Sequence, residues 1–320
     1  MKLKDLYRRV VEIGIDNDLR GKAEIEKLLA EEKAKFDKLD EQEREFFDPD
    51  RLFNPFSDTR LLYGDPETEV RKIIVGIDMD VSEILLTHLL NTTLGRRIDL
   101  IISHHPAGYA LSRLFDVMKL QADLLGELGI SVSVAEKLME KRIGEVERRL
   151  MPINANRPVD VARLLGLPLL CIHTAADNCV TNYLTRLFER EKPARLRDVL
   201  KMLKNIPEYR KAALLQTPPK IVSGSDDSRC GKIFVDMTGG TEGAKEVFDR
   251  FAASGVSTLV GMHISEEHLE NAKKANLNVV IAGHIASDTL GLNLLLDSLE
   301  KPEKQEYICV SGFERIRRDT

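Results

Sequence analysis

The sequence predicts an α/β protein with mostly parallel sheets, preceded by a helical N-terminal segment. From residue 71 onward, short runs rich in Ile, Val and Leu alternate with segments of helical periodicity. Nearly continuous apolar strands of this kind are typical of a parallel sheet that helices cover on both faces. Hydrophobic residues make up 43% of the chain and charged residues 31%, the balance of a globular protein with a substantial core. The 320 residues predict about two domains, at ~100–200 residues per domain.

Residues 1–65 predict a helical N-terminal extension. Leu3, Leu6 and Val10 recur at helical spacing, and opposite charges lie three and four residues apart in the stretch 22–45. Pro49 and its acidic neighbours then break the pattern. We expect a solvated helical hairpin that packs on its own chain or on a sister subunit, rather than a dedicated binding segment.

The rest of the chain divides into a first α/β domain at residues 66–222 and a second α/β segment at residues 223–320. The expected strands are 72–77, 99–103, 131–134 and 169–172 in the first part, and 232–236, 257–260 and 279–282 in the second. The expected helices are 82–94, 114–128, a charged helix that ends near 150, 242–253 and 266–275. A strand, a helix and a second strand lead to His104, and a weak echo of this unit leads to His284.

Composition and charge argue against several classes of protein. The formal net charge of −5 does not suit a surface built to hold nucleic acid. No apolar run approaches the ~20 residues that a membrane-spanning helix needs, and the first residues lack the apolar core of a signal peptide. The cysteines are scattered without a C-x-x-C pair, which favours a reducing cytoplasm over a disulfide framework. They are Cys171, Cys179, Cys230 and Cys309.

Histidines at predicted strand ends are the main candidates for chemistry. His104 and His105 follow a buried strand and precede Pro106, so a turn at that point can direct both imidazoles into one cleft. Imidazole is a common ligand of zinc, manganese and iron. The alternative is a pair of partly exposed loop histidines.

Two further strand ends carry a histidine and an aspartate four residues apart. They are His173 with Asp177 and His284 with Asp288. One turn of helix brings each pair to one side, although capping of the following helix explains each acid equally well in isolation. Together the three strand ends provide nitrogen and oxygen ligands suited to one or two divalent ions.

Other polar residues have simpler interpretations. Asp78 and Asp80 are either cleft acids or acids at a helix N-terminus, and His263 is expected to line the cleft. His88 and His268 are expected at the surface of helices. The glycine-rich stretch 238–243 lacks the lysine of a P-loop, so a tight strand-to-helix connection is favoured over a phosphate site.

With these residues assembled, the sequence resembles the NIF-three-like family, also known as type-two GTP cyclohydrolase homologues. The matching stretches occur in the family's order and cover roughly residues 70–310. They are Asp99 to Pro106, His173 to Asp177, Thr238-Gly239-Gly240, and Gly261 to Glu267 followed by Ala282-Gly283-His284. The resemblance implies two intertwined α/β domains, a dinuclear metal centre in the cleft between them, and toroidal homohexamers.

The resemblance also implies a set of site residues. His173 matches the histidine that opens the family's H-T-x-x-D stretch, as a general base or a group that supports the ligands. Asp288 stands where the family has Glu, so we expect weaker occupancy of the second ion. The implied metal ligands are His104, His105, Asp177, His284 and Asp288.

Two functions follow as hypotheses. The first is a hydrolase with two divalent ions (zinc, iron or manganese) that acts on a nucleotide or a related small molecule, with GTP only weakly supported. The second is a non-catalytic metal-binding ring that acts as a regulatory or scaffold protein. Both lead us to expect a homo-oligomer without a membrane and without nucleic acid.

Cysteine is absent from the implied ligand set, and this can be tested directly. Replacing the four cysteines with serine should leave the metal content per chain unchanged in elemental analysis, because imidazole and carboxylate groups hold the ions. A well-folded cysteine-free protein that binds no metal would show that the ligand assignment is wrong.

Overall fold

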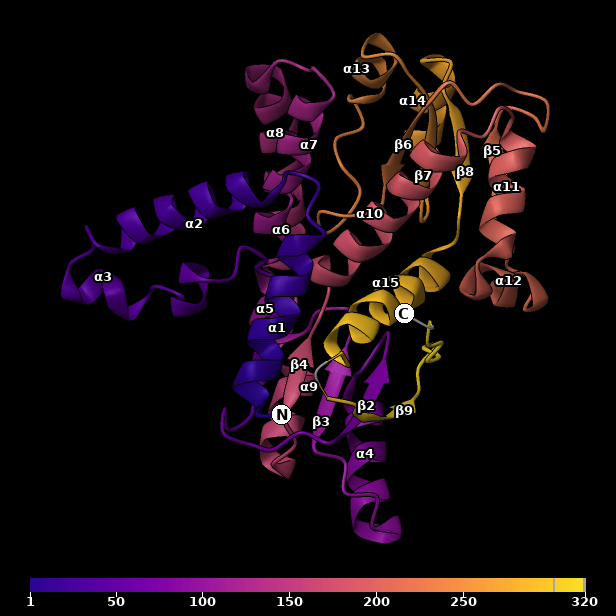
Figure 1. Cartoon of the computed structure of the whole chain (residues 1–320). Helices are drawn as coiled ribbons and strands as arrows, with labels where there is room; N and C mark the ends of the chain where they lie inside the picture. Colours follow the sequence, from indigo (N-terminus) through magenta and orange to yellow (C-terminus); the bar gives the residue numbers. More distant parts are fainter. Residues whose placement is uncertain (302, 319–320) are drawn as a thin grey trace.

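The computed structural model describes residues 1–301 and 303–318, in which two mostly parallel sheets are joined by long helices (Figure 1). This confirms the predicted α/β class. The first sheet has the strand order β1-β4-β3-β2-β9. Its strands are β1 (Arg60–Tyr63), β2 (Lys72–Gly76), β3 (Leu100–Ser103), β4 (Leu169–Cys171) and β9 (Glu306–Cys309). Only β1, at the edge, runs antiparallel to its neighbour.

The second sheet repeats the arrangement of the first. Its order is β5-β8-β7-β6, and the edge strand β5 is again antiparallel to its neighbour β8. Its strands are β5 (Lys220–Ser223), β6 (Lys232–Asp236), β7 (Val256–Gly261) and β8 (Asn278–Ile281). The chain then returns to the first sheet, where β9 pairs with β2. This return makes the two halves intertwined.

Helices surround and connect the sheets. The first half and the N-terminal segment contain α1 (Leu3–Asp16), α2 (Lys22–Phe36), α3 (Glu41–Glu45), the 3-10 helix η1 (Pro49–Leu52), α4 (Val81–Leu94), α5 (Gly108–Ser112), α6 (Leu114–Val117), α7 (Lys119–Glu127), α8 (Val132–Leu150) and α9 (Arg157–Leu165). The helices that follow along the chain are α10 (Thr174–Glu191), α11 (Leu196–Asn205), α12 (Pro207–Leu214), α13 (Phe248–Ala253), α14 (Glu266–Lys274) and α15 (His284–Leu299). None of the helices in the described part of the chain combines the length and the apolar character needed to traverse a bilayer.

Helices α10 and α15 lie between the two sheets in Figure 1 and pack against each other along their length. Each begins directly after a strand, α10 after β4 and α15 after β8. Gly291 permits their close approach, because a Cβ atom at this position would lie 2.5 Å from the carbonyl oxygen of Ala176. The two helices therefore fix how the strand ends of one half face those of the other.

The N-terminal segment is less separate than the sequence indicated. Helix α1 lies in the main core, where Leu3, Leu6 and Val10 are fully buried beside apolar residues of α10 and α15. Only α2 and α3 project from the body, at the left of Figure 1. Strand β1 also falls inside residues 1–65, so the first sheet begins within the predicted extension. Helical periodicity marks an apolar face but does not identify what covers it.

Three other sequence expectations differ from the structure. The expected strand at 131–134 is the start of α8, because Val132 is exposed and the buried residues follow helical spacing from Ala135 to Met139. The expected helix at 242–253 is reduced to α13. The sequence echo matched the strand before His104 with the strand before His284. In the structure β1 to β4 correspond in topology to β5 to β8, so β3, which precedes His104, corresponds to β7, whereas His284 follows β8.

The contact between α10 and α15 predicts opposite effects for two glycine substitutions. Gly291→Ala should lower the free energy of unfolding by ~1–3 kcal/mol, because the added methyl group meets helix backbone. Gly126→Ala in α7 is the matched control and should raise it by ~0.5–1 kcal/mol, since its nearest neighbour lies 4.0 Å away. Urea denaturation of the two variants measures both, and equal effects would contradict the close contact.

Candidate metal centre

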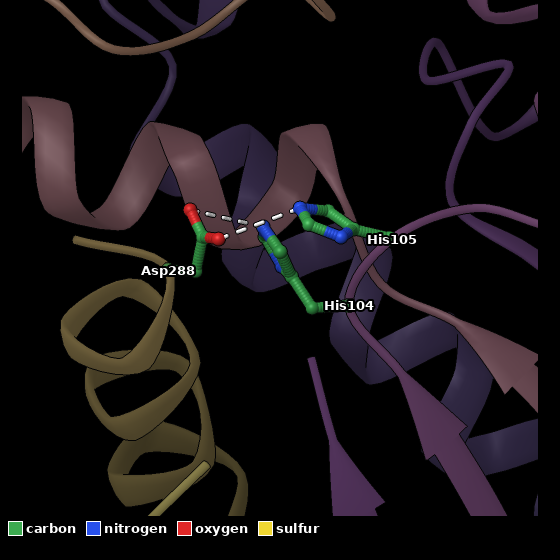
Figure 2. Close-up of side chains that lie close together, drawn as sticks. All are labelled: His104, His105 and Asp288. Carbon is green, nitrogen blue, oxygen red and sulfur yellow. Dashed lines mark ion pairs between the residues drawn. The ribbon is translucent and has the colours of Figure 1, made fainter. Parts of the chain in front are cut away.

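Three of the strand ends converge on one buried point. His104 and His105 follow β3, His173 and Asp177 follow β4, and Asp288 comes from α15 after β8. Carboxyl ends of parallel strands meet at one edge of a sheet, and open α/β sheets bind ligands there. Figure 2 shows Asp288 facing both His104 and His105 across the gap between α15 and the end of β3.

His104 is buried and its ring is fixed. Its Nδ1–H donates to the carbonyl oxygen of Ile172 at 2.9 Å, so Nε2 carries the free lone pair when the ring is neutral. Nε2 lies 3.5 Å from Asp177 Oδ1 and 3.5 Å from Asp288 Oδ1. These three atoms are buried and have no hydrogen-bond partner among the described residues.

A second group of atoms surrounds the other oxygen of Asp288. Oδ2 lies 3.5 Å from His105 Nε2 and 3.5 Å from His284 Nε2. His105 is oriented by Asp78, whose carboxylate lies 2.6 Å from its Nδ1. His284 is partly exposed at the first turn of α15, so this group is more open to solvent than the group around His104.

The unpaired atoms fit divalent cations. A buried carboxylate oxygen without a partner has lost its hydration, so such an atom calls for an ion or an ordered water molecule beside it. Two ligands that bind one ion at ~2.0–2.1 Å in tetrahedral geometry lie ~3.3 Å apart, close to the 3.5 Å observed between His104 Nε2 and each aspartate oxygen. The structure identifies two potential ligand groups: His104, His105 and Asp288; and His104, His173 and Asp177.

His173 lies on the other side of His104, with ring centroids 5.0 Å apart. Its Nδ1 is 2.8 Å from Asp58 Oδ2, and its Nε2 is 3.8 Å from Asp177 Oδ2. Burial lowers the pKa of His173, but the negative charges of Asp177 and Asp58 have the larger combined effect and raise the pKa to about 9. Without a cation in the centre, this imidazole is therefore protonated at neutral pH.

The carboxylates respond to their surroundings in opposite directions. Burial raises the pKa of Asp177 to about 6, although His173 and His104 oppose it. The pKa of Asp288 falls well below its ordinary value, because the attraction of His104 and His105 outweighs its burial. Asp288 is thus held as a carboxylate.

A cavity of about 70 Å³ opens from these groups toward the second sheet. Gly240 and Thr238 of the glycine-rich stretch line it, so this stretch is a wall of the site and is not followed directly by a helix. His263 also lines it as expected, with its ring centroid 4.9 Å from that of His284. Asp236 and Glu242 add negative charge to the same wall.

The structure excludes the helix-capping alternatives. Asp177 and Asp288 lie inside α10 and α15, and neither makes a capping bond at the helix start. Asp80 does cap α4, whereas Asp78 bonds to His105. His268 is not a simple surface residue, because its ring bonds to Ser265 and to the carbonyl oxygen of Gly243.

Sequence analysis missed Asp58, which is fully buried beside His173. The signal was present but weak: β1 is antiparallel, so its start meets the ends of the parallel strands, and Arg60 pairs with Cys171. Recognition of 60–63 as an antiparallel edge strand would have placed Asp58 at the centre.

Comparisons with known proteins agree with the fold. A NIF3 superfamily protein from Sphaerobacter thermophilus has a similar structure, with a TM-score of 0.70 and 28% identity over 80% of this chain and 91% of that chain. Reduced HcgD from Methanocaldococcus jannaschii shares the fold, with a TM-score of 0.52 and 17% identity over 88% of this chain and 96% of that chain. No protein-family model and no curated protein matches the sequence.

The chain is therefore an α/β protein of two intertwined halves with a candidate metal centre, made of histidines and aspartates, at the strand ends. The similarity to the Sphaerobacter protein and the order of the motifs both support the resemblance to the NIF-three-like family.

The position of Asp288 predicts a large effect on metal binding. Asp288→Ala should reduce the metal content per chain by more than half, because its two oxygens face both histidine groups. Elemental analysis after equilibration with zinc measures the loss. Asp80→Ala is the control at the same sheet edge and should keep its metal while losing ~1 kcal/mol of helix capping. Equal metal content in the two variants would remove Asp288 from the ligand set.

Proposed function

We propose that the protein binds two divalent metal ions that share Asp288. One ion is held by His104 Nε2, Asp177 and Asp288 Oδ1, and the other by His105 Nε2, His284 and Asp288 Oδ2. The buried unpaired atoms of His104, Asp177 and Asp288 are the observation that supports this proposal. Mixed imidazole and carboxylate ligands suit zinc, manganese or iron.

The side chain of Asp288 is one methylene group shorter than that of the Glu that the family resemblance leads us to expect at this position. Its place inside α15, with each oxygen 3.5 Å from a histidine nitrogen, supports a side chain that reaches both groups from the existing backbone. Occupancy of the second ion then depends mainly on His284, which is the more exposed ligand.

The reaction we propose for this centre is hydrolysis. Two bound ions would supply an activated water and polarise the oxygen under attack. His173 is placed to accept a proton at Nε2, which points toward Asp177 while Asp58 occupies Nδ1. Asp78 and Ile172 hold the rings of His105 and His104, so these ligands do not reorient during a reaction.

The cavity restricts the substrate. Its 70 Å³ is far below the ~300–1,000 Å³ of pockets that enclose a small-molecule ligand, so only one reacting group enters it. A nucleotide or related small molecule would leave most of its surface outside. Among the described residues that line the cavity there is no Lys or Arg, so nothing there supports recognition of a triphosphate such as that of GTP.

The small cavity also supports the second candidate, a metal-binding regulatory or scaffold protein without turnover. A centre that accepts ions and water but little else is suited to holding metal. The two candidates share the metal centre and differ only in whether a substrate reacts there.

We propose a homo-oligomer, a hexameric ring by the family resemblance. In α4, Leu85, Leu86, Leu89 and Leu94 are exposed, and Glu83 is the only charged residue of the helix. An uncharged apolar helix face of this kind favours contact with another protein surface. The cysteines are free, which supports a reducing cytoplasm as the location.

Metal-dependent turnover distinguishes the candidates. The protein loaded with zinc or manganese is assayed against nucleotides and simple phosphate esters, and again after removal of the ions with a chelator. A hydrolase should lose activity on chelation and regain it with metal, and His104→Ala should abolish it, whereas Cys309→Ser should not. Stoichiometric metal binding without turnover on any substrate would favour the scaffold.

A further inference from the structure

Asp58 is a buried carboxylate outside the proposed ligand set. Its side chain is fully enclosed, and Oδ2 accepts hydrogen bonds from His173 Nδ1 at 2.8 Å and from Thr174 Oγ1 at 2.7 Å. The second oxygen, Oδ1, is buried without a hydrogen-bond partner among the described residues. A charge of this kind is costly to bury, so its retention points to a specific interaction.

The backbone around Asp58 is held in place. Thr59 Oγ1 accepts from the backbone N–H groups of His173 and Ala175, at 3.2 and 3.4 Å. Arg60 is buried, donates to the carbonyl oxygens of Phe56 and Thr59, and pairs with Asp48. The segment before β1 is therefore joined to the start of α10 through main chain and side chains.

This geometry determines which nitrogen of His173 faces the centre. A carboxylate accepts hydrogen bonds, so the contact with Asp58 places a proton on Nδ1. Nε2 is then directed away from Asp58, toward Asp177 Oδ2 at 3.8 Å. Rotation of the ring would break the 2.8 Å hydrogen bond and leave the buried carboxylate of Asp58 with the hydroxyl of Thr174 as its remaining donor among the described residues.

We propose that Asp58 is a positioning residue that fixes the ring orientation and the Nδ1–H tautomer of His173, so that Nε2 faces the metal centre. The part of this inference that concerns proton transfer rests on the proposed hydrolase function. The tautomer itself does not, because it follows from the contact between Asp58 and His173. Asp58 is therefore a residue of the N-terminal segment that sets the orientation of a side chain in the metal centre.

The direct test is the nitrogen-15 NMR spectrum of the histidine side chains. In the metal-free protein, at a pH where the spectrum shows the His173 ring to be neutral, the ring should carry its proton on Nδ1, which faces Asp58. Asp58→Asn should shift His173 toward the Nε2–H tautomer, because the amide can donate to Nδ1. Thr174→Val is the matched control: it removes the other donor to Oδ2 and should leave the tautomer unchanged.

Metal content and kinetics separate positioning from a structural role. Zinc content should be equal in the wild type and Asp58→Asn, because Asp58 holds no ion in the proposed centre. Where the wild type hydrolyses a phosphate ester, Asp58→Asn should lower kcat by ~10–100-fold with little change in KM. The same substitution in a His173→Ala background should then have no further effect.

The outcomes are separable. Nε2–H in the wild type, or an unchanged tautomer in Asp58→Asn, would overturn the proposal, and the wild-type spectrum decides if the variant does not fold. Absence of turnover in the wild type contradicts only the hydrolase function, since the spectra of metal-free protein still test Asp58. Further loss of activity in the His173→Ala background would show that Asp58 acts independently of His173.

Discussion

The rest of the structure depends on the burial of negative charge where the strand ends meet. Asp58, Asp177 and Asp288 are all buried, and each has a carboxylate oxygen without a hydrogen-bond partner among the described residues. Charges of this kind are stable inside a protein only when cations or firmly held donors face them. The surrounding imidazoles meet part of this need, and the proposed ions meet the remainder. The centre therefore requires rigid neighbours on every side.

Rigidity comes from the packing of α10 against α15. The two helices carry Asp177 and Asp288 into the centre, and the absence of a side chain at Gly291 lets their backbones approach closely. Helix α1 packs against both and completes the same core. A shift of either helix would separate the oxygens from the nitrogens of His104 and His105. The same contacts between helices thus determine both the stability of the core and the geometry of the site.

The two halves share a topology but contribute unequally to the site. In the first sheet Ser103 pairs with Gly76 and is followed by His104 and His105. In the second sheet Gly261 pairs with Asp236, and the corresponding positions hold Met262 and His263. The second half therefore supplies its proposed ligands, His284 and Asp288, from α15 after β8, and the end of β7 contributes only a wall of the cavity. Strand β9 and the contacts of Arg315 with Asp297 and Glu300 fasten the C-terminal part to both.

The sequence by itself determined the α/β class, most of the parallel strands and the histidine and aspartate pairs, because apolar runs and short motifs are local signals. Tertiary structure alone decided that α1 is a core helix, that β1 brings Asp58 to His173, and that Asp288 reaches two histidine groups. These features depend on which surfaces pack together. A periodic pattern records that a face is apolar, but the element that covers it, and the atoms that then meet, are set by contacts between residues far apart in the chain.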